Sequence, residues 1–224
     1  MAYLRTGRFG DYYGCYLGES HHLSDSQMET NARYIYSFLS NAGWSLNAIS
    51  AILGNMQAES SINPGRWESE DVLNMSKGYG LVQWTPASKY IEWSDEQGYE
   101  DPSEMDNNLN RILYEVENGI QWIKVPNSYD ISFKEFTTSD KSVQYLAESF
   151  LINYERPKDQ SDSVKAFRGS LAKAWYTFLS GETPTDPSNP SDPSEPSETK
   201  GKRKGYNFLL FNSRRKKQWI KRNF

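Results

Sequence analysis

The chain has one cysteine, Cys15, among its 224 residues, so no intramolecular disulfide can form. It has only two histidines, the adjacent His21 and His22, which argues against a histidine-rich metal site. A cysteine protease would need Cys15 to pair with a histidine, and we expect all three residues in a loose N-terminal arm. We therefore predict no metal, no cofactor and no thiol chemistry.

Long apolar runs are also missing. No stretch approaches the roughly 18 apolar residues that a membrane span requires. The first residues contain Arg5, Arg8 and Asp11, where a secretory signal would need an uninterrupted apolar segment. We expect neither a transmembrane segment nor a signal peptide, so an extracellular target would have to be reached by another route.

Apolar residues make up 37% of the chain, and the shortage is concentrated at its C-terminal end. Residues 182–199 contain five of the ten prolines and no large apolar residue, which is typical of a disordered linker. Residues 200–224 form a short basic tail with ten Lys or Arg and no acid. Since the whole chain has a formal charge of −4, the first 199 residues carry −14.

Apolar residues recur at helical spacing in five segments, which predicts a mostly α (α+β) domain. The predicted helices cover about 26–42, 46–59, 104–116, 139–154 and 163–180. The first would open with a capping box at Ser26 and Glu29, and the last would turn Phe167 inward. Residues 60–100 are polar and rich in turns, and we expect a small β element around Gly80–Trp84. Residues 1–23 read as an N-terminal extension.

The second of these helices carries Glu59 in its last turn. Ser45 can cap it, and at about 100° per residue Glu59 lies roughly 20° from the direction of Ile52 on the apolar face. A carboxylate in apolar surroundings is costly to ionise, so such a group can act as a general acid. The alternative is a surface glutamate beyond the end of the apolar stripe. A glycine-rich aromatic turn follows at Gly78–Trp84 and could form a wall for a sugar ring.

Three strings in order carry a family resemblance. Glu59-Ser60, then Gly80-Leu81-Val82-Gln83, then the string from Asn153 to Pro157 resemble the motifs of goose-type lysozymes and soluble lytic transglycosylases. The longer strings Leu53–Ser60, Gly80–Ser88 and Tyr154–Pro157 resemble the tail-associated lysozymes of bacteriophages, among them the tail-knob lysozyme domain of short-tailed Bacillus phages. The resemblance covers about residues 25–181.

This resemblance implies a lysozyme-like catalytic domain at 24–181. It also implies a glycosidase that cleaves the β-1,4 bond between N-acetylmuramic acid and N-acetylglucosamine in peptidoglycan, with Glu59 as general acid. The protein would then be a virion component at the tail tip that opens the host wall at genome entry. The positions that would bind the glycan strand are Ser60, Tyr79, Gly80, Gln83, Trp84 and Tyr154.

The roles of several polar residues stay open at this point. Gln83 could give both a donor and an acceptor to an N-acetyl group, and Tyr154 is either a core aromatic or a hydroxyl near Glu59. A second carboxylate has four candidates, and each has a structural alternative. Glu155 would be salt-bridged at a helix end, beside Arg156, and the other three would be solvated loop charges. The three loop candidates are Glu68, Glu70 and Asp71.

Two other functions remain alternatives. A lytic transglycosylase would give 1,6-anhydromuramic products, and a non-enzymatic tail or wall-binding module would keep the fold without the chemistry. The transglycosylase third motif reads Ala-Tyr-Asn-Ala-Gly, whereas this chain has Asn153-Tyr154-Glu155-Arg156-Pro157, which favours hydrolysis. We expect no nucleic-acid partner.

The basic tail predicts docking to an anionic surface, such as a wall polymer or an acidic face of another tail protein; the alternative is a solvated charge run. A tethered positive segment raises encounter rates with anionic surfaces, and this attraction fades when the Debye length falls to roughly 3 Å at 1 M salt. Purified cell walls should therefore retain the full chain better than residues 1–181 at low salt, with the difference vanishing at high salt. Equal retention at both salt concentrations would leave only the solvated charge run.

Overall fold

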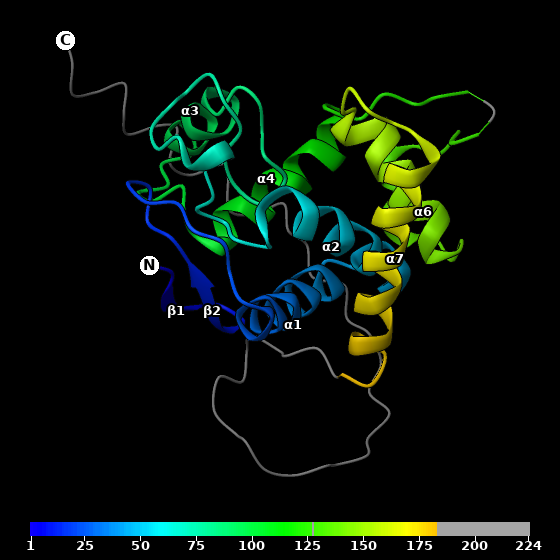
Figure 1. The fold of residues 1–224 in the computed structure, drawn as a ribbon, viewed down its shortest axis with the longest axis horizontal. Helices are drawn as coiled ribbons and strands as arrows, with labels where there is room; N and C mark the ends of the chain where they lie inside the picture. The colour runs from blue at the N-terminus through cyan, green and yellow to red at the C-terminus, as the bar shows by residue number, and fades with distance from the viewer. Residues whose placement is uncertain (127, 183–224) are drawn as a thin grey trace, which may run out of the picture. The chain divides into compact units, whose positions relative to one another are not determined.

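The computed structural model describes residues 1–126 and 128–182, so the predicted basic tail and nearly all of the predicted linker lie outside the described residues. The predicted fold class is confirmed, because the described part is mostly helical with one small sheet (Figure 1). In chain order the elements are β1 (Tyr3–Gly7), β2 (Gly10–Gly14), α1 (Asp25–Asn41), α2 (Leu46–Ser60), a 3₁₀ turn (Glu68–Glu70), α3 (Ser88–Glu96), α4 (Met105–Asn118), α5 (Phe133–Thr138), α6 (Val143–Phe150), a π-helical turn (Leu151–Glu155) and α7 (Asp162–Leu179).

The predicted helix around Glu59 is confirmed as α2. Ser45 caps it by accepting a hydrogen bond from the backbone N–H of Ala48 at 3.1 Å, and the helix ends where Ser61 turns left-handed at φ 56°. The apolar side chains from Ala48 to Met56 are completely buried, and the helix packs against α1, α5, α6 and α7. α2 is therefore the central helix of the core, and Glu59 lies in its final turn.

Two details of the predicted helices are wrong. α1 is capped by Ser24 and not by Ser26, since the backbone N–H of Ser24 donates to Oε1 of Gln27 at 3.0 Å. On α7 the predicted inward residue Phe167 is 55% exposed, and Arg168 is buried on the same face as Trp175. The inward face of α7 thus contains a charged residue, which a hydrophobic pattern cannot reveal.

The N-terminal segment is not the loose extension that the sequence indicated. Strands β1 and β2 pair antiparallel as a hairpin that lies against α1 (Figure 1), and the side chains of Phe9, Tyr12 and Cys15 are buried. The hairpin is only five residues per strand, and its aromatic content was not enough to distinguish it from a loop. It forms part of the core of the described domain.

The β element expected around Gly80–Trp84 is present only as isolated bridges and not as a sheet. That segment is a tight turn with isolated bridges from Tyr79 to Trp67 and to Trp84, and within the described residues the only sheet is the N-terminal hairpin. The short helices α3 and α5 lay within stretches read as turns or left unassigned. They are nine and six residues long, which is too short for a helical period to stand out.

The most extensive helix packing lies between α2 and α7, whose backbones approach each other at Gly54. Gly54 faces the backbone of Ala172 there, and a Cβ atom at position 54 would lie 2.6 Å from the Ala172 nitrogen. Only glycine permits this approach. Within the described residues, no helix has the length and apolar character that a membrane crossing requires.

The crossing predicts the effect of a single methyl group. Gly54→Ala should lower the free energy of unfolding by about 1–3 kcal/mol, because backbone atoms of α7 cannot move aside without repacking. The matched control is Gly169→Ala on α7, where the nearest atom to a new Cβ is the flexible Gln144 Cγ at 3.0 Å. That variant should be neutral or slightly stabilised by the higher helix propensity of alanine. Equal shifts of both variants in urea denaturation would contradict the close crossing.

Candidate active site

The carboxylate of Glu59 faces a cation from α7. Nη2 of Arg168 donates to Oε1 of Glu59 at 2.5 Å, and Nη1 donates to the backbone carbonyl of Asn55 at 2.8 Å. The side chain of Arg168 is 10% exposed and that of Glu59 is 22% exposed. Glu59 is therefore reachable from solvent. We expected a purely apolar pocket around its carboxylate, but the carboxylate pairs with an arginine.

Glu155 lies at the end of the π-helical turn, close enough to Glu59 that the two charges interact. The residue is partly exposed, but its Oε1 atom is shielded from solvent and has no hydrogen-bond partner among the described residues. Burial raises the pKa of the Glu155 carboxyl well above its usual range, and the negative charge of Glu59 raises it further. The expected ion pair with Arg156 is wrong, since that guanidinium donates to the backbone carbonyls of Gln121 and Asn153.

The two carboxyls line one open hollow of about 270 Å³. We call it the acidic hollow, because Glu59, Glu68 and Glu155 line it together with Arg66 and Gln83. A second hollow of about 190 Å³ shares Gln83, Thr85 and Glu155 with the first. We call it the basic hollow, because Lys89 and Arg156 are among its further lining residues.

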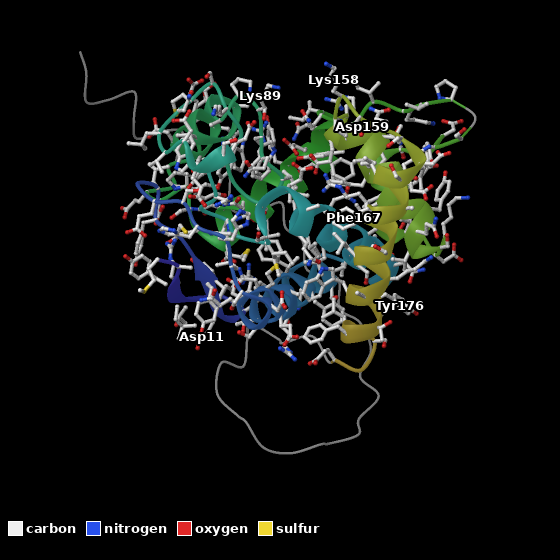
Figure 2. The ribbon with its side chains drawn as sticks, in the orientation of Figure 1. Asp11, Lys89, Lys158, Asp159, Phe167 and Tyr176 are labelled. Atoms are coloured by element: carbon white, nitrogen blue, oxygen red, sulfur yellow. The ribbon has the colours of Figure 1, made fainter. Side chains whose placement is uncertain are left out.

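The two hollows share Gln83, Thr85 and Glu155 in their linings, and together we call them the depression. Lys89 belongs to α3, and in Figure 2 it lies on the upper edge of the view, as does Lys158 from the segment before α7. The depression is thus built by segments far apart in the chain. Its charge changes from acidic beside Glu59 to basic beside Lys89.

Gln83 lines both hollows, but its amide group is already engaged. Nε2 donates to the backbone carbonyl of Arg66 at 3.1 Å and to that of Gly80 at 2.9 Å. The expectation that Gln83 offers a donor to an N-acetyl group is therefore not met in this geometry. Oε1 remains as a possible acceptor toward the hollow.

Ser60, Tyr79 and Gly80, which we predicted to contact the glycan, support the Gly80–Trp84 turn from its buried side. Ser60 is fully buried, and its hydroxyl donates to the backbone carbonyls of Met56 and Leu81. Gly80 has φ 84°, and a Cβ there would lie 2.6 Å from Oδ1 of Asn108. Tyr79 is fully buried too. These residues hold the turn against α2 and α4, and none of them lines either hollow.

Tyr154 and Trp84 meet at a buried carboxylate that the sequence did not single out. Oη of Tyr154 donates to Oε2 of Glu115 at 2.5 Å, and Nε1 of Trp84 donates to Oε1 of Glu115 at 3.0 Å. Arg111 donates to the same Oε1 at 2.9 Å. Tyr154 is therefore the core aromatic of the two alternatives, and its hydroxyl is not placed at Glu59.

Glu115 belongs to α4 and is completely buried. Burial raises the pKa of its carboxyl, while the hydrogen bond from Tyr154 and the charge of Arg111 act in the opposite direction. This cluster fastens the Gly80–Trp84 turn and the Tyr154 segment to the same helix. The second and third sequence motifs are thereby fixed relative to each other.

The remaining carboxylate candidates divide into two groups. Glu70 pairs with Arg66, which lowers the pKa of its carboxyl, and hydrogen bonds from Asn74 and Lys77 lower the pKa of Asp71. Both are exposed, and neither lines a hollow, so the solvated-charge reading fits them. Glu68 does line the acidic hollow, and its carboxylate accepts the backbone N–H of Gly78 at 2.8 Å.

Sequence reasoning missed Arg168 and Glu115, the charged partners that organise the site. Both are buried charged residues on helices that were predicted from the spacing of their apolar residues. Such a prediction places every charged residue on the solvent side. The one available signal for Glu115 was its position four residues after Arg111, a spacing that favours a helical ion pair. Nothing in the sequence linked Arg168 to Glu59.

Comparison with known proteins agrees with this architecture. The family model of the phage tail lysozymes matches residues 30–179, which is more than half of the chain, and the chain belongs to this family. It is similar to Morphogenesis protein 1 of Bacillus phage B103, with 48% identity over 164 residues. The match covers 73% of this chain but 43% of that relative, so the chain corresponds to less than half of the other protein. The predicted family resemblance is confirmed.

The Glu115 cluster yields a stability prediction. Tyr154→Phe removes the donor to Oε2 and leaves a buried acceptor without that partner, so the free energy of unfolding should fall by about 1–3 kcal/mol. The control is Tyr176→Phe on α7, since Tyr176 is 38% exposed and Figure 2 shows it on the lower part of that helix. Urea denaturation measures both. A Tyr154→Phe midpoint equal to that of the control would contradict the importance of this hydrogen bond.

Proposed function

We propose that this chain is a peptidoglycan-degrading tail lysin that cleaves the β-1,4 bond between N-acetylmuramic acid and N-acetylglucosamine, with Glu59 as general acid. Membership of the phage tail lysozyme family supports a peptidoglycan hydrolase in general terms. The choice of bond comes from the sequence motifs. The rest of the proposal follows from the chemistry that the acidic hollow can perform.

The observation that carries the proposal is a pair of carboxyls, Glu59 and Glu155, lining one open hollow. Cleavage of a glycosidic bond commonly uses two carboxyl groups. One protonates the leaving oxygen, and the other activates the attacking water or attacks C1 itself. Glu59 comes from α2 and Glu155 from the turn after α6, so the pair is held by two packed elements. A site on rigid elements can keep the reacting groups in register with the sugar.

The transition state of this reaction is oxocarbenium-like, so its positive charge needs negative groups nearby. The acidic hollow supplies them, with Glu68 at its rim in addition to the pair. The glycan strand would run through the depression, across Gln83 and Thr85, into the basic hollow. Lys89 and Arg156 there could receive anionic substituents of the strand.

The second carboxyl supports hydrolysis over transglycosylation. A transglycosylase closes its product with a hydroxyl of the sugar itself, whereas a hydrolase must activate a water, and Glu155 offers a group for that purpose. A purely wall-binding module is disfavoured for a different reason. A buried carboxyl oxygen without a partner costs stability, and binding alone gives no reason to retain one.

The location of the protein is part of the proposal. Its relative is named for morphogenesis in a Bacillus phage, which supports a component of the virion. A lysin at the tail tip would open the wall locally at genome entry. Other tail proteins or anionic wall polymers would be partners of residues 200–224, which lie outside the described residues.

Glu59→Gln should reduce clearing of a Gram-positive wall suspension by about 10²–10⁴-fold, since the amide cannot transfer a proton. The fold should survive, because glutamine has the same shape and can still accept a hydrogen bond from Arg168. The matched control is Glu117→Gln, an exposed position on α4 that should keep full activity. Thermal unfolding verifies both proteins, and a folded, fully active Glu59→Gln variant would refute the assignment.

The same digestion separates the two enzymatic alternatives. Mass spectrometry of the soluble fragments should find reducing N-acetylmuramic ends from hydrolysis. A predominance of 1,6-anhydromuramic ends would instead establish the transglycosylase.

A further inference from the structure

One carboxyl oxygen in the acidic hollow has no structural explanation. Oε1 of Glu155 is shielded from solvent and receives no hydrogen bond from the described residues, although Arg156 is its neighbour in the chain. An unpartnered buried acceptor costs about 1–3 kcal/mol, and a buried charge costs more. In contrast, the carboxylate of Glu115, which is fully buried, has three donors.

The charged groups around Glu155 come from several packed elements. After burial, the charge of Glu59 on α2 raises the pKa of Glu155 most, and the charge of Arg168 on α7 lowers it. Glu115 on α4 adds a second negative charge, and Arg156 a second positive one. The hollows bring further groups to the same depression: Arg66, Glu68 and Lys89.

Arg168 can neutralise only one of the two neighbouring carboxyls, and its guanidinium is committed to Glu59 at 2.5 Å. Two carboxylates in one partly dry site repel each other, so the first proton to bind the pair is held more tightly than by a lone carboxylate. The proton belongs on the member that lacks the arginine and is more deeply buried. Both criteria select Glu155, in agreement with the raised pKa of its carboxyl.

We propose that Glu155 is the second catalytic carboxyl of this site, and that it holds the single proton of the Glu59–Glu155 pair in the free protein. This inference rests on the proposed glycosidase function. It assigns Glu155 a role opposite to the salt-bridged helix end that the sequence favoured. It also explains how Glu59, with an arginine beside it, obtains a proton to transfer.

The proton then completes a closed cycle. As the bond between C1 and the glycosidic oxygen breaks, the single proton passes from Glu155 to Glu59 and from Glu59 to the leaving oxygen. The pair is left with one more negative charge, which stabilises the cationic sugar. Water forms the new bond to C1 and returns its proton to Glu155, so each turnover consumes one water and regenerates the pair.

The test compares Glu155→Gln, Glu155→Asp and the wild type, with kcat/KM on purified walls measured across pH. Glutamine has the shape of the neutral carboxyl but cannot release a proton, so activity should fall by at least about 10²-fold at every pH. Aspartate keeps an ionisable group with a lower intrinsic pKa. It should retain partial activity, and the alkaline limb of its profile should lie at lower pH than that of the wild type.

A purely structural role predicts a different result. In that case Glu155→Gln would keep activity within about threefold of the wild type, with the same alkaline limb, and the proposal would be overturned. Thermal unfolding separates loss of chemistry from loss of fold. Because the pKa of Glu155 is raised in the folded state, its stabilising effect is lost as pH rises through that pKa. Glu155→Gln should therefore be at least as stable as the wild type in alkaline solution.

A second measurement does not depend on activity. Titration of the glutamate carboxyl carbons by NMR should show Glu155 ionising above the ordinary range in the wild type. The Glu59→Gln variant should move that titration to lower pH, because the neighbouring negative charge is gone. A Glu155 that titrates in the ordinary range would overturn the proposal. A wild type that clears no wall, but shows the raised titration, would refute the proposed function and leave the shared proton standing.

Discussion

The site depends on the close crossing of α2 and α7 at Gly54. Because the two backbones meet there, Arg168, four residues before Ala172, lies over the last turn of α2. Its guanidinium then binds both the carboxylate of Glu59 and the backbone carbonyl of Asn55. A cation at the C-terminal end of a helix is favoured by the helix dipole, so the arrangement suits α2 as well as its glutamate. A larger residue at position 54 would separate the helices and move the arginine away.

Glu115 and Glu155 both have a buried carboxyl oxygen, but they differ in their hydrogen-bond donors, which indicates a structural role for the first and a chemical role for the second. Glu115 is surrounded by three donors and joins the second and third motifs to α4, which makes it a structural anchor. Glu155 has no donor to its buried oxygen and faces the hollow beside Glu59. An unsatisfied buried carboxyl oxygen lowers stability, and this one lies beside a second carboxyl in an open hollow. The active-site proposal places the reactive proton on the glutamate that lacks hydrogen-bond donors.

The long helices could be predicted because their apolar residues repeat over several turns, as in α2 and α4. The hairpin β1–β2 and helices α3 and α5 could not, because each is too short to show a period. A charged residue caused another error. On α7 the large apolar Phe167 was expected inside, whereas the structure exposes it and buries Arg168. Pattern reasoning assumes that charge faces solvent, and it fails wherever a buried partner makes the charge acceptable.

The sequence by itself determined the mostly helical class, the position of Glu59 in the last turn of its helix, and the ordered motifs of the phage tail lysozyme family. Tertiary structure alone decided the partners of those residues. Arg168 is 109 positions from Glu59, and Tyr154 is 39 positions from Glu115. Local sequence fixes which face of a helix a side chain occupies, but the charge that meets it depends on how distant helices pack. The protonation of a buried carboxyl is set by those charges and by burial, so the chemistry of the pair emerges only in the folded chain.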